Sequence, residues 1–326
     1  MSPTPATALP PDATDAQVQA AAQAIVAAHR DTFASAIDDT RVAAYTRNEP
    51  AYRAARRATA ELGFIAQDAE CLAQAWQRQT ERTGQFDATA WPDDPADFGL
   101  APWPRKNAFA PCPGALGLYA VLPDAEWVGR MARAGVPTVQ LRFKSDDAQA
   151  IAREVRTAVE AVRGTLSLLF INDHWREAIA AGAYGVHLGQ EDLDTLSADD
   201  LAAIRNADLR LGLSTHGYAE MCRVDAVSPS YIAMGAVFPT TLKAMPTAPQ
   251  GTGRLNAYAR LMRQHSLVAI GGIDAERMPQ VLRDSGVGSV AVVRAITGAS
   301  DPEQAAKGLM QLVQENISGV FSDPEK

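Results

Sequence analysis

Short apolar runs alternate with longer amphipathic stretches through the last two-thirds of the chain. Runs of this length and β-branched composition are typical of buried strands, and the stretches between them place apolar residues at helical spacing. The runs are LGLYAV from Leu116, TVQLRF from Thr138, SLLFIN from Ser167, YGVHL from Tyr184, LRLGLS from Leu209, YIAMG from Tyr231, LVAIGG from Leu267 and SVAVVR from Ser289. The helical stretches include 124–134, 146–162, 175–181, 274–285 and 302–314.

Alternating strands and helices predict a parallel sheet covered by helices. Eight such repeats fit an α/β protein with a closed (β/α)8 barrel of the TIM type. An open doubly wound sheet is the structural alternative, but no GxGxxG sequence follows any of the runs. The number of repeats therefore favours a closed barrel over an open sheet.

The chain before the barrel has a different pattern. Ala, Gln, Arg and Glu dominate, with apolar residues such as Val18, Ile25 and Phe33 at helical spacing. A proline-rich run then separates this part from the first strand. We expect five segments: a disordered tail at 1–14, a helical region at 15–90, an extended linker at 91–114, the barrel at 115–317 and a C-terminal tail at 318–326.

Composition narrows the classes of partner. A formal net charge of -8 argues against a nucleic-acid or anionic-membrane surface, so any phosphate chemistry needs local cations. The three cysteines are far apart and lack metal-ligand spacing, which indicates a reducing compartment. No basic leader with an apolar core and no membrane-spanning run is visible. The expected location is the cytoplasm, and the oligomeric state, a homo-oligomer included, is left open.

Polar residues alternate with apolar ones on the second expected strand. If Val139, Leu141 and Phe143 face the helices, then Gln140, Arg142 and Lys144 point inward at the barrel mouth. A buried cation without a partner is costly. Either an anionic ligand or an internal ion-pair network would satisfy these two cations.

Acidic residues follow the next two strands. Asn172 and Asp173 end the third run, and Asp192 comes shortly after the fourth. Two carboxylates in adjacent loops, near cations that would bind a diphosphate, suit a hard cation such as Mg²⁺. A helix N-cap is the structural alternative for Asp173.

The segment GAVFPTTLKAMPTAPQG after the sixth strand is long for a barrel connection, and we interpret it as a lid or ligand loop containing Lys243. The seventh strand ends in Gly271 and Gly272, and the eighth in Val293 and Arg294. Loops after these two strands hold a monophosphate in many barrels, and glycine permits close approach. A tight strand-to-helix turn is the alternative for the glycines.

Three further residues stand near strand ends. Ser214 is a candidate phosphate donor or a helix cap, and His216 is a candidate acid–base group. His187 fits a satisfied interior histidine better than a catalyst. No nucleophile–base–orienter arrangement is visible, so hydrolysis by a triad is not indicated.

Seven segments, in the order and at the strand positions expected, resemble the thiamine phosphate synthase family from Gly117 to about Val313. They are VQLRFK at 139–144, INDHW at 171–175, GVHLGQEDL at 185–193, GLSTH at 212–216, FPTTLK at 238–243, IGGI at 270–273 and VAVVRAI at 290–296. The resemblance implies that hydroxymethylpyrimidine diphosphate is joined to hydroxyethylthiazole phosphate with release of diphosphate.

The resemblance also implies residue roles. The residues expected to hold the pyrimidine diphosphate are Gln140, Arg142, Lys144, Asn172, Ser214 and Lys243, with Arg142, Lys144 and Lys243 acting in catalysis. Asp173 and Asp192 would bind Mg²⁺. Thr240, Gly272, Val293 and Arg294 would line the thiazole phosphate side.

Two positions depart from the family pattern. Leu242 stands where many relatives have a second threonine, so that one hydroxyl contact to the thiazole phosphate is either lost or supplied by Thr241. Arg294 stands where many relatives have serine. Two alternative functions are carried forward. One is the related thiazole tautomerase, with His216 transferring the proton, and the other is a noncatalytic regulator that binds thiamine phosphates. The helical region before the barrel matches no motif.

Overall fold

The computed structural model describes residues 9–33, 45–240 and 247–317. Within these ranges the chain divides into two compact units. One contains the residues up to Trp103 together with Gly217–Ala226 and residues 247 and 248. The other contains most of the rest, from Pro104 onward. We call them the helical unit and the barrel unit.

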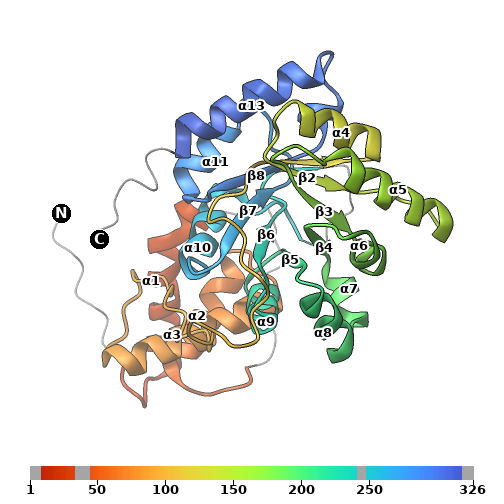
Figure 1. The fold of residues 1–326 in the computed structure, drawn as a ribbon. Coiled ribbons are helices and arrows are strands. Elements are labelled where there is room, and N and C mark those ends of the chain that lie inside the picture. The colour runs from red at the N-terminus through yellow and green to blue at the C-terminus, as the bar shows by residue number, and fades with distance from the viewer. Residues whose placement is uncertain (1–8, 34–44, 241–246, 318–326) are drawn as a thin grey trace. The chain divides into compact units, whose positions relative to one another are not determined.

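The barrel unit is a closed parallel barrel in which the strands follow one another in chain order and β8 pairs with β1. Its strands are β1 (Gly117–Leu122), β2 (Thr138–Leu141), β3 (Leu168–Asn172), β4 (Gly185–Leu188), β5 (Arg210–Thr215), β6 (Tyr231–Met234), β7 (Ser266–Ile270) and β8 (Ser289–Val292). Each expected strand is present, and the closed (β/α)8 architecture is confirmed. In Figure 1 helices such as α4, α5 and α13 lie outside the strands.

Helices separate the strands along the chain, and their bounds are α4 (Ala125–Arg133), α5 (Ala148–Ala161), α6 (Trp175–Ala181), α7 (Gln190–Thr195), α8 (Ala198–Asn206), α9 (Tyr218–Val227), α10 (Gly251–Leu261), α11 (Met278–Ser285), α12 (Arg294–Thr297) and α13 (Pro302–Ile317). Side-chain caps explain several of the starts. Asp124 accepts from the N–H of Trp127 at 2.9 Å, and Asp147 caps α5 in the same way.

The barrel interior contains large aromatic side chains as well as small aliphatic ones. Its buried cluster consists of Leu116, Tyr119, Val121, Phe170, Tyr231, Ala233, Val268 and Ala291. Alternate residues such as Val139 and Leu141 of β2 are also buried, as expected for strands covered by helices. Two interior tyrosines are unusual for such a core, because each must find a hydrogen-bond partner.

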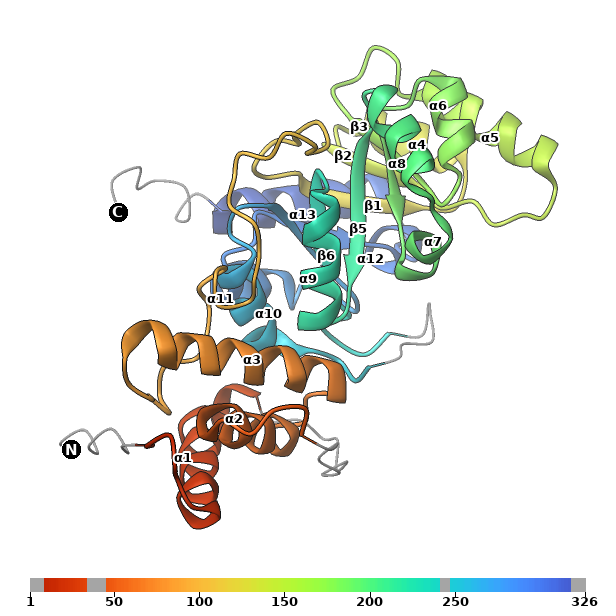
Figure 2. The ribbon, with the colours of Figure 1, turned by 90° about the horizontal axis from the view of Figure 1, so that it is seen from below.

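The helical unit begins with α1 (Asp15–Phe33), α2 (Pro50–Glu61) and α3 (Ala66–Thr83), which pack against one another (Figure 2). An aromatic cluster fills its core, with His29, Phe33, Trp76 and Trp91 in ring contact. The helical interpretation of residues 15–90 therefore holds over these three helices. Residues 1–8 and 318–326, which contain most of the expected tails, lie outside the described ranges.

The expected linker at 91–114 contains neither a helix nor a strand. Its first half is nevertheless anchored, because Trp91 and Phe98 are buried. None of the helices that the structure describes is both long and apolar enough to cross a bilayer.

Candidate active site

Two amides meet where β2 and β3 end. Gln140 and Asn172 are 4% and 8% exposed, and the Nε2 of Gln140 donates to the Oδ1 of Asn172 at 2.9 Å. Within the described part of the chain, neither side chain has another hydrogen bond. The Nδ2 group of Asn172 and the Oε1 of Gln140 are therefore available to a ligand, as buried polar groups require.

The two expected cations lie beyond β2 rather than on it. β2 ends at Leu141, so Arg142 and Lys144 lie in the loop that follows the strand. Their expected placement on the strand was wrong. The backbone N–H of Arg142 still bonds to the carbonyl of Leu122 at 2.7 Å, which keeps the chain beside β1 for one more residue. Lys144 then turns outward, with its side chain 57% exposed, and its Nζ lies 2.5 Å from Oδ2 of Asp173.

Asp173 occupies an unusual backbone position. Its φ is 64°, a left-handed conformation that few residues other than glycine adopt readily, although Asp and Asn tolerate it. Its N–H bonds to the carbonyl of His187 at 3.0 Å. The N-cap of α6 is His174, so the carboxylate of Asp173 does not serve as that cap. Strained residues of this kind concentrate at functional sites.

Asp192 lies in the first turn of α7 rather than in a loop as expected. Its Oδ2 accepts from the N–H of Gly189 at 2.8 Å. Burial raises the pKa of the Asp192 carboxyl; the N–H of Gly189 acts against this, and the nearby charge of Asp173 raises the pKa further. Two carboxylates that repel each other in a half-buried position are an energetic cost that a cation would relieve.

Ser214 belongs to a buried chain of hydrogen bonds. Its Oγ lies 2.9 Å from Nε2 of His187, whose Nδ1 lies 2.7 Å from the hydroxyl of Tyr231. Ser214 therefore does not cap the helix that follows. His216 comes one residue after the end of β5 and is partly buried. His187 is the satisfied interior histidine expected from the sequence.

Backbone from two loops meets at the end of β7. Gly271 and Gly272 have φ values of 105° and 64°, and the N–H of Phe238 bonds to the carbonyl of Gly271 at 2.9 Å. A Cβ on Gly272 would come within 2.6 Å of the carbonyl of Pro239. These glycines are needed for conformation and for close approach.

The other residues expected on the thiazole side have mixed positions. Thr240 is partly buried and follows Pro239, Val293 packs against the barrel core, and Arg294 is exposed at the start of α12. Thr241, Leu242 and Lys243 lie outside the described residues.

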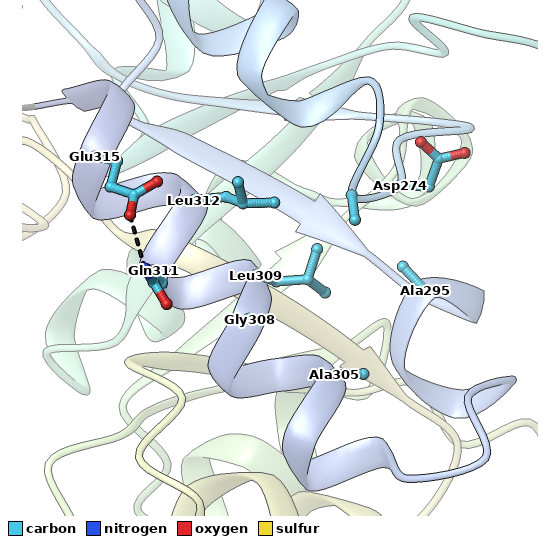
Figure 3. A pocket seen from close by; sticks show the side chains of 9 residues that line it. Asp274, Ala295, Ala305, Gly308, Leu309, Gln311, Leu312 and Glu315 are labelled. Carbon is cyan, nitrogen blue, oxygen red and sulfur yellow. Dashed lines mark hydrogen bonds between the residues drawn. The ribbon is translucent and has the colours of Figure 1, made fainter.

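A separate hollow lies beside α13 (Figure 3). Asp274, Ala295, Leu309, Leu312 and Glu315 are among its lining residues. Its described lining contains two carboxylates and no Lys or Arg. A surface of this charge does not suit a phosphate, so the strand ends remain the candidate site.

No group of three or more His, Cys, Asp or Glu side chains positioned to hold a metal occurs among the residues that the structure describes. The sequence-based set contains two protein carboxylates, Asp173 and Asp192. A magnesium ion commonly takes only one or two carboxylates and completes its shell with water and substrate phosphate.

Sequence reasoning missed the partners of Ser214. Tyr231 reaches His187 from β6, and the Nε2 of Gln190 donates to the backbone carbonyl of Ser214 at 2.7 Å. One signal was present in the sequence: Gly212, two residues before Ser214 in the same strand. A side chain there would collide with the ring of Tyr231, so this glycine marks the space that the tyrosine fills.

The comparisons with known proteins show which family the chain belongs to. The family model described as thiamine monophosphate synthase matches residues 118–296, which is more than half of the chain. The chain belongs to the thiamine monophosphate synthase family. The matched residues run from β1 into α12.

Two relatives of known name are similar over nearly their whole length. The thiamine-phosphate synthase of Neisseria meningitidis serogroup B is 54% identical over 204 residues, which cover 63% of this chain and 98% of the relative. That of Serratia proteamaculans is 50% identical over 206 residues, covering 63% of this chain and 95% of the relative. Enzymes of this name are transferases.

A solved structure supports the fold. The thiamine phosphate pyrophosphorylase from Pyrococcus furiosus is 27% identical, with a TM-score of 0.55, and the match covers 64% of this chain and 98% of that one. The residues up to 117 lie outside the family match, whereas α9, which the helical unit contains, lies within it. This member of the family therefore has a helical region in addition to the matched barrel.

Proposed function

We propose that the chain is a thiamine-phosphate synthase. It would join 4-amino-2-methyl-5-(diphosphooxymethyl)pyrimidine to 4-methyl-5-(2-phosphoethyl)thiazole, giving thiamine phosphate and diphosphate. The observation that carries the proposal is the group at the ends of β2 to β4, in which Lys144 pairs with Asp173 and the charge of Asp173 acts on Asp192. The positive charge of Lys144 is complementary to a diphosphate, and the two carboxylates are complementary to the cation that accompanies it.

The bond changes need little help from proton transfer. The bond between the pyrimidine methylene carbon and the diphosphate oxygen breaks, and its electron pair leaves with the diphosphate. The thiazole nitrogen supplies the lone pair for the new carbon–nitrogen bond. Catalysis therefore depends on stabilising the departing negative charge and on orienting the two rings.

The charged residues have matching roles in this proposal. Arg142, Lys144 and Lys243 would bind the diphosphate oxygens, and Gln140, Asn172 and Ser214 would add neutral hydrogen bonds. Among the described residues, the Arg142 side chain makes no hydrogen bond or ion pair, which is consistent with a side chain that binds an anionic ligand. On the other side, Gly272 with Thr240, Thr241, Val293 and Arg294 would hold the thiazole phosphate.

The two carboxylates fit a magnesium ion. Asp173 and Asp192 offer hard oxygen ligands, and their mutual repulsion would be relieved by a divalent cation. Bound there, Mg²⁺ would neutralise charge on the diphosphate. The protein's part is to hold the carboxylates: Gly189 fixes one oxygen of Asp192, and the left-handed backbone of Asp173 aims its carboxylate toward Lys144.

The test is turnover by the purified full-length chain. Protein, both substrates and MgCl₂ are incubated, and thiamine phosphate is measured by oxidation to its fluorescent thiochrome. We expect product only when both substrates and Mg²⁺ are present. No product above a boiled-protein control would overturn the proposal. A location in the cytoplasm stays a prediction.

A further inference from the structure

A line of four hydrogen-bonding side chains crosses the barrel interior from β1 to β5. The hydroxyls of Tyr119 and Tyr231 lie 2.8 Å apart, Tyr231 lies 2.7 Å from Nδ1 of His187, and Nε2 of His187 lies 2.9 Å from Oγ of Ser214. Both tyrosines are 1% exposed and His187 is 9% exposed. The line therefore begins in the dry core and ends at the strand-end site.

The first bond has a defined direction. Within the described ranges, the hydroxyl of Tyr119 has one hydrogen-bond partner, that of Tyr231. Burial raises the pKa of Tyr119 well above its ordinary value, so the hydroxyl keeps its proton. If Tyr119 only accepted, its proton would be buried without a partner, at a cost of about 1–3 kcal/mol. Tyr119 therefore donates to Tyr231.

The remaining directions follow from the first. Tyr231 is also held protonated by burial, which raises its pKa, and its second polar neighbour is Nδ1 of His187. Tyr231 must donate its own proton to that nitrogen. An imidazole that accepts at Nδ1 carries its proton on Nε2 and donates it to Ser214 Oγ. The hydroxyl proton of Ser214 is then left to be donated elsewhere.

We propose that Tyr231 and His187 are positioning residues that make Ser214 a hydrogen-bond donor to the diphosphate of the pyrimidine substrate. This inference rests on the proposed function for the identity of the ligand. The opposite direction would place the histidine proton on Nδ1 and consume the Ser214 proton in a bond to Nε2. Ser214 would then present only lone pairs to an anion, which is repulsive.

The packing supports a fixed line. The rings of His187 and Tyr231 stack at a centroid distance of 5.7 Å with an interplanar angle of 19°. Gly212 leaves the space that the ring of Tyr231 occupies. The Nε2 of Gln190 also holds the backbone carbonyl of Ser214 at 2.7 Å. His187, Ser214 and Tyr231 come from the neighbouring paired strands β4, β5 and β6, so their relative positions are set by the barrel.

The first test measures the tautomer and needs no turnover. In the full-length chain labelled with ¹⁵N-histidine, the ring-nitrogen shifts of His187 should report a neutral imidazole protonated on Nε2. Tyr119→Phe should keep this tautomer, because Tyr231 still donates to Nδ1. Tyr231→Phe should give a mixture. An Nδ1–H tautomer in the wild type, or an unchanged Nε2–H tautomer in Tyr231→Phe, would overturn the proposal.

The second test measures ligand binding and rate. Ser214→Ala should weaken binding of inorganic diphosphate with Mg²⁺ by roughly ten- to a hundredfold, since bonds to charged groups are worth about 1.5–3 kcal/mol. Tyr231→Phe should weaken it several-fold, and the double variant should bind like Ser214→Ala alone. Losses that multiply in the double variant would show that Tyr231 does not act through Ser214.

The two tests separate this inference from the proposed function. If the wild type makes no thiamine phosphate but binds diphosphate with the predicted coupling, the proposed function fails and the hydrogen-bond line stands. If turnover is normal but the coupling is absent, the proposed function stands and the hydrogen-bond line fails. The rate readout is KM for the pyrimidine diphosphate, which Tyr231→Phe should raise more than it lowers kcat.

Discussion

Buried polar groups serve different purposes in the two units. In the helical unit several of them bond to backbone: His29 lies 3.0 Å from the carbonyl of Ala88, and the side chains of Trp76, Arg78 and Gln79 donate to carbonyls between residues 87 and 97. At the strand ends of the barrel unit, in contrast, some of them bond to one another, as Gln140 does to Asn172. Polar side chains that bond to backbone hold a chain segment in place. Polar side chains that lie together at one end of a sheet, with donor or acceptor atoms not yet bonded, suit a ligand.

The helical unit also includes a helix from the family-matched part of the chain. The carboxylate of Asp68 in α3 accepts from the N–H of Ala219 at 2.9 Å, at the start of α9, and its approach leaves no room for a side chain on Gly217. Tyr218 is fully buried, its ring stacks on Phe98 at 5.4 Å, and its hydroxyl accepts from Nε1 of Trp91 at 2.9 Å. The N-terminal residues therefore complete the packing of α9.

Removing the N-terminal residues should have the largest effect. A chain that starts at Pro111 lacks the Asp68 cap and the aromatic neighbours of Tyr218. We expect a loss of about 3–4 kcal/mol in unfolding free energy, from roughly 1 for the cap and about 2–3 for the exposed tyrosine. Thermal unfolding followed by circular dichroism should show a Tm lowered by about 10 °C or more. A chain that starts at Asp15 is the control, and equal Tm values for all three chains would refute the packing role.

Asp173→Asn tests whether the polar groups at the strand ends of the barrel unit serve a ligand. Asn keeps the left-handed backbone at φ 64° but removes the charge that faces Lys144 and Asp192. We expect kcat/KM for the synthase reaction to fall roughly a hundredfold, with a Tm change of a few degrees at most. Asp146→Asn, an exposed neighbour beyond Lys144, is the control. Activity within twofold of wild type would remove Asp173 from the active site.

Tyr218→Phe tests whether a buried hydrogen bond in the helical unit stabilises the fold. It leaves the buried Nε1 of Trp91 without its partner, at a cost of about 1–3 kcal/mol in unfolding free energy. Urea unfolding measures the change. The double variant Trp91→Phe with Tyr218→Phe removes both groups and should lose less than the sum of the two single variants. Strict additivity would argue against a bond between them.

Leu166→Lys should have the smallest effect. This leucine is 97% exposed in the loop before β3, so the substitution removes no packing. We expect a change in unfolding free energy within about 0.5 kcal/mol and unaltered turnover. A larger destabilisation measured by urea unfolding would mean that this face of the barrel is covered in solution.

The strands were predictable because their apolar runs are short and β-rich, and each appears within a residue or two of its expected start. Shorter or more polar helices were not predicted: α7 has six residues and α12 has four, too few to show a period. The same limit explains Asp192, which was placed in a loop and lies in the first turn of α7.

Long-range contacts mark where sequence reasoning stopped. Arg142 and Lys144 were assigned to a strand because alternation continues past Leu141, although the strand ends there. Asp68 and Ala219 are 151 residues apart, and His187 and Tyr231 are 44 apart. No local pattern specifies such pairs, since they depend on helix packing and on the register of a closed barrel. The roles of the candidate residues stay predictions.

The central claim is that the barrel site joins two substrates and releases diphosphate. Phosphorus NMR of one reaction mixture follows every phosphorus-containing substrate and product at once. We expect inorganic diphosphate and thiamine phosphate to appear in equal amounts, and only with Mg²⁺ and both substrates present. Diphosphate released without thiamine phosphate, or no change in either substrate, would contradict it.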